Sequence, residues 1–162
     1  MQSRLSTAVS VLSMLLLLVL GSNAGAQEES ASNMDILRDK IAADKKLLVA
    51  VNLILTESEA AAFWPMYESY QAELEAINQR LAQLILEYAD AYNNKTLSDA
   101  QAKQLLIESI AIEEAELALR RTYAERLDGV IPIIEAARFL QIESKIRALI
   151  RFDLAAQIPL VY

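Results

Sequence analysis

Four glutamates lie close together in one short stretch of this sequence. Of all the residues in the chain, they come closest to a catalytic or metal-binding pattern. They are Glu108, Glu113, Glu114 and Glu116. Carboxylate-bridged metal pairs in helix bundles also take histidines from Glu-x-x-His motifs, and this chain contains no histidine. We therefore interpret the cluster as a solvated helix face, and we expect neither a metal site nor a cofactor.

The sequence also lacks residues with which many enzymes begin their chemistry. It has no cysteine to act as a nucleophile and no histidine to act as a general base. With only three glycines, it contains no phosphate-binding loop and no Gly-x-Ser-x-Gly turn. We expect a protein that is not an enzyme and acts by binding other molecules.

The charge and the N-terminal residues restrict the partners and the compartment. The 22 acidic residues outnumber the 15 basic ones, so we expect no nucleic-acid binding. Arg4, an apolar run at residues 9–20 and the small residues 24–26 form the three parts of a secretory signal peptide. The apolar run is shorter than the roughly 20 residues that span a bilayer, so we expect no integral membrane span. We predict a signal peptide at 1–26, its removal, and export to the periplasm.

Apolar periodicity predicts one all-α domain at residues 34–157, after a disordered tail at 27–33 and before an extended tail at 158–162. We expect about four helices, at 34–53, 55–92, 98–127 and 132–156. Polar turn residues at 93–96 fold the second and third helices into a long antiparallel hairpin, which Pro65 bends.

The second helix organises the fold, because its apolar residues recur at alternating spacings of four and three. They are Phe63, Tyr67, Tyr70, Leu74, Ile77, Leu81, Leu84 and Tyr88. Such a heptad seam needs partner helices along its length, and we expect the protein to form a homodimer. The third helix supplies one broad apolar face. It consists of Leu105, Leu106, Ile110, Ile112, Leu117, Leu119, Tyr123 and Leu127.

Two capping boxes mark the starts of the second and third helices. Their residues are Leu55, Thr56 and Glu59 in the first, and Leu97, Ser98 and Gln101 in the second. In each box the hydroxyl accepts from a backbone N–H three residues later, and the Glu or Gln side chain bonds back. Both boxes resemble the Leu-Thr-x-x-Gln motif of the Spy/CpxP family of small exported helical proteins. The chain resembles a divergent branch of this family, with Glu59 in place of the glutamine.

The resemblance implies a bent helical hairpin that pairs into a cradle-shaped dimer. Some members are ATP-independent chaperones of envelope stress, some restrain a sensor kinase, and relatives bind metals. We predict a chaperone-like protein that holds partly unfolded clients. The alternative is a signalling adaptor that docks on a sensor kinase or another envelope protein, and a plain structural coiled coil is a third option.

The candidate client-binding and partner-binding residues are apolar side chains beyond the seam, basic side chains at their rim, and the C-terminal tail. They are Trp64, Met66, Phe152, Lys45, Lys46, Arg120, Arg121, Ile158 and Leu160. For the rings around Pro65 we favour core packing over a ligand-binding patch, and Trp64 is the ring that core packing explains least. Closure of a dimer core is an equally good explanation for the whole set.

Overall fold

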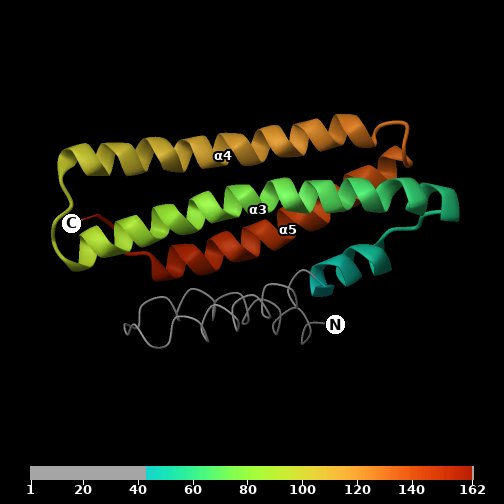
Figure 1. Ribbon diagram of the computed structural model, residues 1–162. Helices are drawn as coiled ribbons and strands as arrows, with labels where there is room; N and C mark the ends of the chain where they lie inside the picture. The colour runs from blue at the N-terminus through green and yellow to red at the C-terminus, as the bar shows by residue number, and fades with distance from the viewer. Residues whose placement is uncertain (1–42, 162) are drawn as a thin grey trace, which may run out of the picture. The chain divides into compact units, whose positions relative to one another are not determined.

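The computed structural model describes residues 43–161, which are mostly helical and contain no β-strand (Figure 1). A helical stretch at 43–52 is followed by α3 (Glu57–Asn93), α4 (Asp99–Leu127) and α5 (Ile133–Gln157). The predicted all-α fold of about four helices is confirmed. In this part of the chain, no helix has the length and apolar character that crossing a membrane requires. The predicted signal peptide, the tail at 27–33 and the start of the first helix lie outside the described residues.

The described chain divides into two compact units, each of which has its own features. Unit 1 contains residues 43–54 and 141–160, and unit 2 is built on residues 55–140. The hairpin of α3 and α4 lies wholly within unit 2, where the two helices run antiparallel and side by side (Figure 1).

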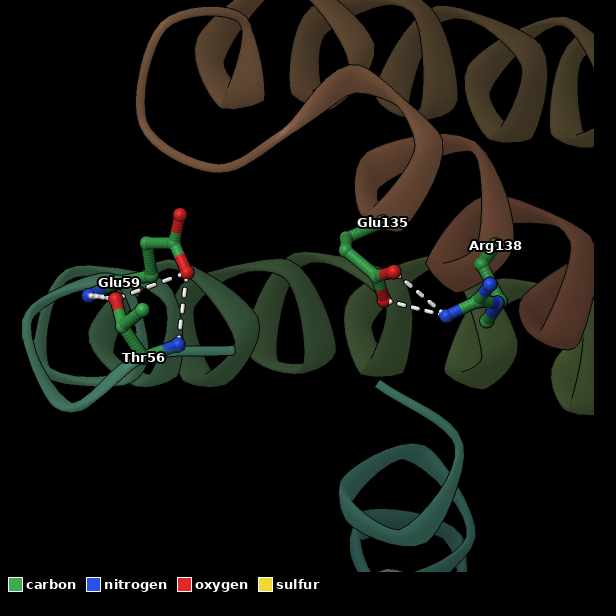
Figure 2. A network of polar contacts seen from close by, with 4 residues as sticks. All are labelled: Thr56, Glu59, Glu135 and Arg138. Atoms are coloured by element: carbon green, nitrogen blue, oxygen red, sulfur yellow. Dashed lines mark hydrogen bonds and ion pairs between the residues drawn. The ribbon is translucent and has the colours of Figure 1, made fainter. Parts of the chain in front are cut away.

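The first capping box starts α3 as predicted (Figure 2). Thr56 Oγ1 accepts a hydrogen bond from the Glu59 N–H at 3.3 Å, and Glu59 Oε2 accepts one from the Thr56 N–H at 2.7 Å. From this cap α3 continues without interruption through Pro65 to Asn93. The bend at Pro65 stays a prediction.

The hairpin turn also lies where the sequence predicted it, but the second capping box is only half formed. Lys95 adopts a positive φ of 54°, and the Thr96 N–H donates to the Ala91 carbonyl at 2.9 Å. Ser98 Oγ accepts from the Gln101 N–H at 3.3 Å, without a return bond from the Gln101 side chain. That side chain instead lines a groove between α3 and α4.

An aromatic cluster forms the core of unit 2. The ring of Phe139, near the start of α5, lies 5.3 Å from Phe63, 6.0 Å from Tyr67 and 5.4 Å from Tyr70, between ring centroids. Tyr70 in turn lies 5.1 Å from Tyr123 of α4, and all five side chains are buried. Because each buried ring of this size stabilises the fold by roughly 1.5–3 kcal/mol, this cluster fixes α3, α4 and the start of α5 together.

The heptad seam of α3 faces inward. Phe63, Tyr67, Tyr70 and Ile77 are buried. The other seam residues, which are Leu74, Leu81, Leu84 and Tyr88, are half-buried. Four of the eight seam residues are therefore buried within a single chain, and the other four are only partly covered.

The apolar residues of α4 divide into two faces, so the predicted single broad face is wrong. Ile112, Leu119, Tyr123 and Leu127 are buried. Leu106, Ile110 and Leu117 are exposed, although they belong to the same predicted face. Residues two positions apart on a helix point about 200° away from each other, so Ile110 and Ile112 cannot share one side.

The connection between α4 and α5 follows the predicted chemistry. Gly129 adopts a φ of 76° directly after α4, as expected of a C-terminal cap, and the Pro132 carbonyl accepts from the Glu135 N–H at 2.8 Å. The side chain of Glu135 is buried, and Arg138 Nη1 lies 2.6 and 2.8 Å from its two carboxylate oxygens (Figure 2). This contact compensates a carboxylate charge that would otherwise be costly to bury.

Candidate functional site

Unit 1 presents apolar side chains on its N-terminal helical stretch and just after it. Leu47, Val51 and Ile54 are 61%, 69% and 78% exposed. Leu47 and Val51 lie four residues apart on one side of the helix, and Ile54 follows the end of the helix at residue 52. Val49, on the opposite side, is fully buried. We call Leu47, Val51 and Ile54 the N-terminal stripe. This surface was not predicted from the sequence, although the spacing of Leu47 and Val51 is a signal that could have indicated it.

Lys45 anchors this helical stretch to α5 within unit 1. Its Nζ lies 2.8 Å from Glu143 Oε2, and the two side chains are 14% and 2% exposed. Removing one member of such a buried pair leaves an uncompensated charge in the interior. The structure therefore gives Lys45 a structural role, whereas Lys46 beside it is exposed.

The C-terminal part of unit 1 exposes further apolar side chains. Phe152 of α5 is 74% exposed, and Leu160 in the tail after α5 is 90% exposed. Ile158 is half-buried, and its N–H donates to the Leu154 carbonyl at 2.9 Å. Of the predicted apolar binding residues, Phe152 and Leu160 have the exposure that contact with another protein requires.

The predicted residues in unit 2 are less available. Trp64 and Met66 are half-buried, and the Trp64 ring packs edge-on against Phe63 at 5.1 Å and Tyr67 at 5.4 Å. Trp64 thus extends the aromatic core. Arg120 is half-buried and Arg121 is exposed, both on α4. Each unit holds part of the predicted set, with Trp64, Met66, Arg120 and Arg121 in unit 2 and the others in unit 1.

A groove of about 470 Å³, lined by polar and apolar side chains, lies between α3 and α4. Four glutamines contribute to its lining: Gln79, Gln83, Gln101 and Gln104. Arg80 and Glu108 join the two helices across it, with Arg80 Nε and Nη2 each 2.9 Å from Glu108 Oε1. These side chains offer hydrogen bonds but no nucleophile. The groove was not predicted from the sequence, in which its signal is the repeated glutamine on two helices predicted to face each other.

A second polar contact joins α3 to α4 nearer the aromatic core. Tyr123 Oη donates to Glu73 Oε1 at 2.7 Å, and Arg126 Nη1 lies 3.5 Å from the same oxygen. Burial raises the pKa of the Tyr123 phenol above 10.0, and the Glu73 carboxylate raises it further. The phenol therefore stays protonated and acts as a hydrogen-bond donor.

The carboxylate cluster of α4 is not one solvated face. Glu116 is buried, and Glu108 pairs with Arg80, whereas Glu113 and Glu114 are exposed. The prediction of a solvated side chain is wrong for Glu116, because its position four residues after Ile112 places it on the inward side of the helix. Between residues 43 and 161, no group of acidic side chains is arranged to hold a metal ion.

Comparison of the chain with models of protein families, with curated proteins and with solved structures finds no match. The resemblance to the Spy/CpxP family accordingly stays a prediction that rests on the sequence motifs.

Proposed function

We propose that this protein is an exported, non-enzymatic binding protein of chaperone type, which holds partly unfolded envelope proteins on the apolar surface of unit 1. The observation that carries the proposal is the exposure of the N-terminal stripe, with Phe152 exposed in the same unit. We also propose membership of the Spy/CpxP family and action in the periplasm during envelope stress, for which the N-terminal 26 residues and the capping motifs are the support.

Exposed apolar side chains of this kind suit weak binding to many sequences. Burying one aliphatic or aromatic side chain completely stabilises a contact by roughly 1.5–3 kcal/mol, without a requirement for particular hydrogen bonds. A few such contacts hold an unfolded segment and release it again without nucleotide hydrolysis. Lys46 lies next to the stripe and supplies charge at its edge, and the formal net charge of −7 keeps the protein soluble.

The test is the suppression of light scattering by a thermally aggregating client. Protein expressed from the full chain and present in several-fold excess should suppress the scattering. A variant carrying Leu47→Gln, Val51→Gln and Ile54→Gln should lose most of this effect, because its stripe no longer offers apolar contacts.

A matched control carries Ile133→Gln and Ile134→Gln, which replace similarly exposed side chains in unit 2. It should suppress scattering as well as the unmodified protein does. Absence of suppression by the unmodified protein, or an equal loss in the control, would overturn the proposal.

The C-terminal tail favours a second candidate function, that of an adaptor for one envelope protein such as a sensor kinase. Leu160 is almost fully exposed after Pro159 has ended the helical geometry. Deletion of residues 158–162 should then remove one specific partner from a pull-down while leaving the suppression of client aggregation intact. Loss of aggregation suppression with no change in the recovered partners would exclude the adaptor.

A further inference from the structure

The outward side of α4 carries a regular pattern of its own. Its residues alternate at spacings of four and three, and we call them the outer stripe: Lys103, Ile107, Ile110, Glu114, Leu117 and Arg121. The three apolar members are 56%, 51% and 53% exposed, and the three charged members are exposed as well. On a helical projection this stripe lies opposite the buried side of α4.

We propose that the outer stripe pairs with the outer stripe of a second copy of this chain. The two α4 helices run antiparallel, and Ile107 of each copy lies opposite Ile110 of the other. A two-fold axis between these residues makes both halves of the contact identical, as an isologous dimer requires.

Charge complementarity supports a second copy of this chain as the partner, and it also supports this alignment of the two α4 helices. When Ile107 faces Ile110, Lys103 of each copy faces Glu114 of the other, because both pairs are symmetric about the same point on the helix. The isoleucines are thus flanked on both sides by an interhelical ion pair, an arrangement that sets register and orientation in coiled coils.

Other alignments of two stripes place charges unfavourably. A parallel, in-register pair sets Lys103, Glu114 and Arg121 each against its own copy. Antiparallel pairs shifted by one heptad set Ile110 against Glu114 in one direction, and Ile107 against Lys103 in the other. The proposed register alone among these avoids like charges in contact and a charge against isoleucine.

Four of the eight seam residues of α3 are buried within the chain and the other four are half-buried, so the seam is already partly used. The sequence predicted a homodimer from that seam, and we place the dimer contact on the outer stripe of α4 instead. A stripe of this length buries an area at the lower end of stable interfaces, about 1,000 Å², so the dimer dissociates on dilution. The inference stands apart from client binding by unit 1.

Charge reversal tests the register directly. The mass of protein expressed from the full chain is measured by sedimentation equilibrium over a series of concentrations. The variants K103E and E114K should each weaken the dimer by about tenfold or more, because each reversal creates two like-charge contacts by symmetry. The double variant K103E/E114K should restore the dimer. R121E is the matched control, since Arg121 faces no charged residue in this register, and it should change the dissociation constant little.

A second measurement uses the lack of cysteine in the chain. A mixture of K103C and E114C proteins should form a crosslinked dimer with a short bismaleimide, whereas a mixture of K103C and R121C proteins should not. A monomer at all concentrations, failure of the double reversal to restore pairing, or preferred crosslinking to R121C would overturn the proposal.

Discussion

Lys95 occupies a backbone conformation that side chains with a Cβ atom disfavour. Its φ of 54° lies in the left-handed region, where a residue other than glycine loses about 1–2 kcal/mol. We predict that Lys95→Gly raises the free energy of unfolding by about 0.5–1 kcal/mol, because glycine relieves this strain but loses more entropy on folding. Urea unfolding checks the prediction. Lys145→Gly, at an exposed position inside α5, is the control and should instead lower stability by about 1 kcal/mol.

Tyr123 links stability to alkaline pH. Its folded-state pKa is raised above 10.0, so its contribution to stability is complete below pH 10 and is lost as the pH rises through the folded-state value. We predict that Tyr123→Phe costs about 1 kcal/mol at neutral pH, through the lost hydrogen bond to Glu73, and that this cost disappears at high pH.

Unfolding in denaturant at neutral pH and above the folded-state pKa provides the measurement. Glu73→Gln is the control, because glutamine keeps an acceptor but removes the charge. In this variant the pKa of Tyr123 should fall, since the Glu73 carboxylate is one of the causes that raise it. A Tyr123→Phe cost that is the same at both pH values would contradict the assignment.

The elements of the fold follow from local chemistry to within a residue or two. Thr56 and Ser98 predicted the starts of α3 and α4, and Gly129 predicted the end of α4. The absence of the return bond in the second box was not predictable from the sequence. It depends on tertiary packing, because Gln101 lines a groove whose other wall is α3. Local sequence signals a cap, whereas the packing around it decides which partner a long side chain takes.

The two caps differ in a way that mutagenesis resolves. We predict that Glu59→Ala lowers the free energy of unfolding by about 0.5–1 kcal/mol, because it removes the hydrogen bond to the Thr56 N–H. Gln101→Ala should leave it within about 0.5 kcal/mol of the unmodified protein, since this side chain makes no capping bond. Equal losses measured by thermal or denaturant unfolding would mean that both boxes are complete.

At the scale of the whole molecule, the sequence predicted the class of fold but not which apolar residues are covered. Phe139 meets Phe63 and Tyr70 from a distant part of the chain, and no periodic pattern encodes that contact. The same limit applies to the candidate site. Phe152 and Leu160 were predicted and are exposed, whereas Trp64 packs on the core and Lys45 pairs with Glu143. Apolar spacing shows that a face exists, but only tertiary packing decides whether it meets the core or the solvent.

Ile110 and Ile112 are the same residue type and lie two positions apart on α4. They provide the most direct test of which side of α4 faces the core and which side is exposed. Ile112 is 1% exposed and Ile110 is 51% exposed. We predict that Ile112→Ala lowers the free energy of unfolding by about 2–5 kcal/mol, through lost burial and a new cavity. Ile110→Ala should change it by less than about 0.5 kcal/mol in dilute protein. Equal losses for the two variants, or a larger loss for Ile110→Ala, would contradict the orientation of α4, in which Ile112 faces the core and Ile110 faces the solvent.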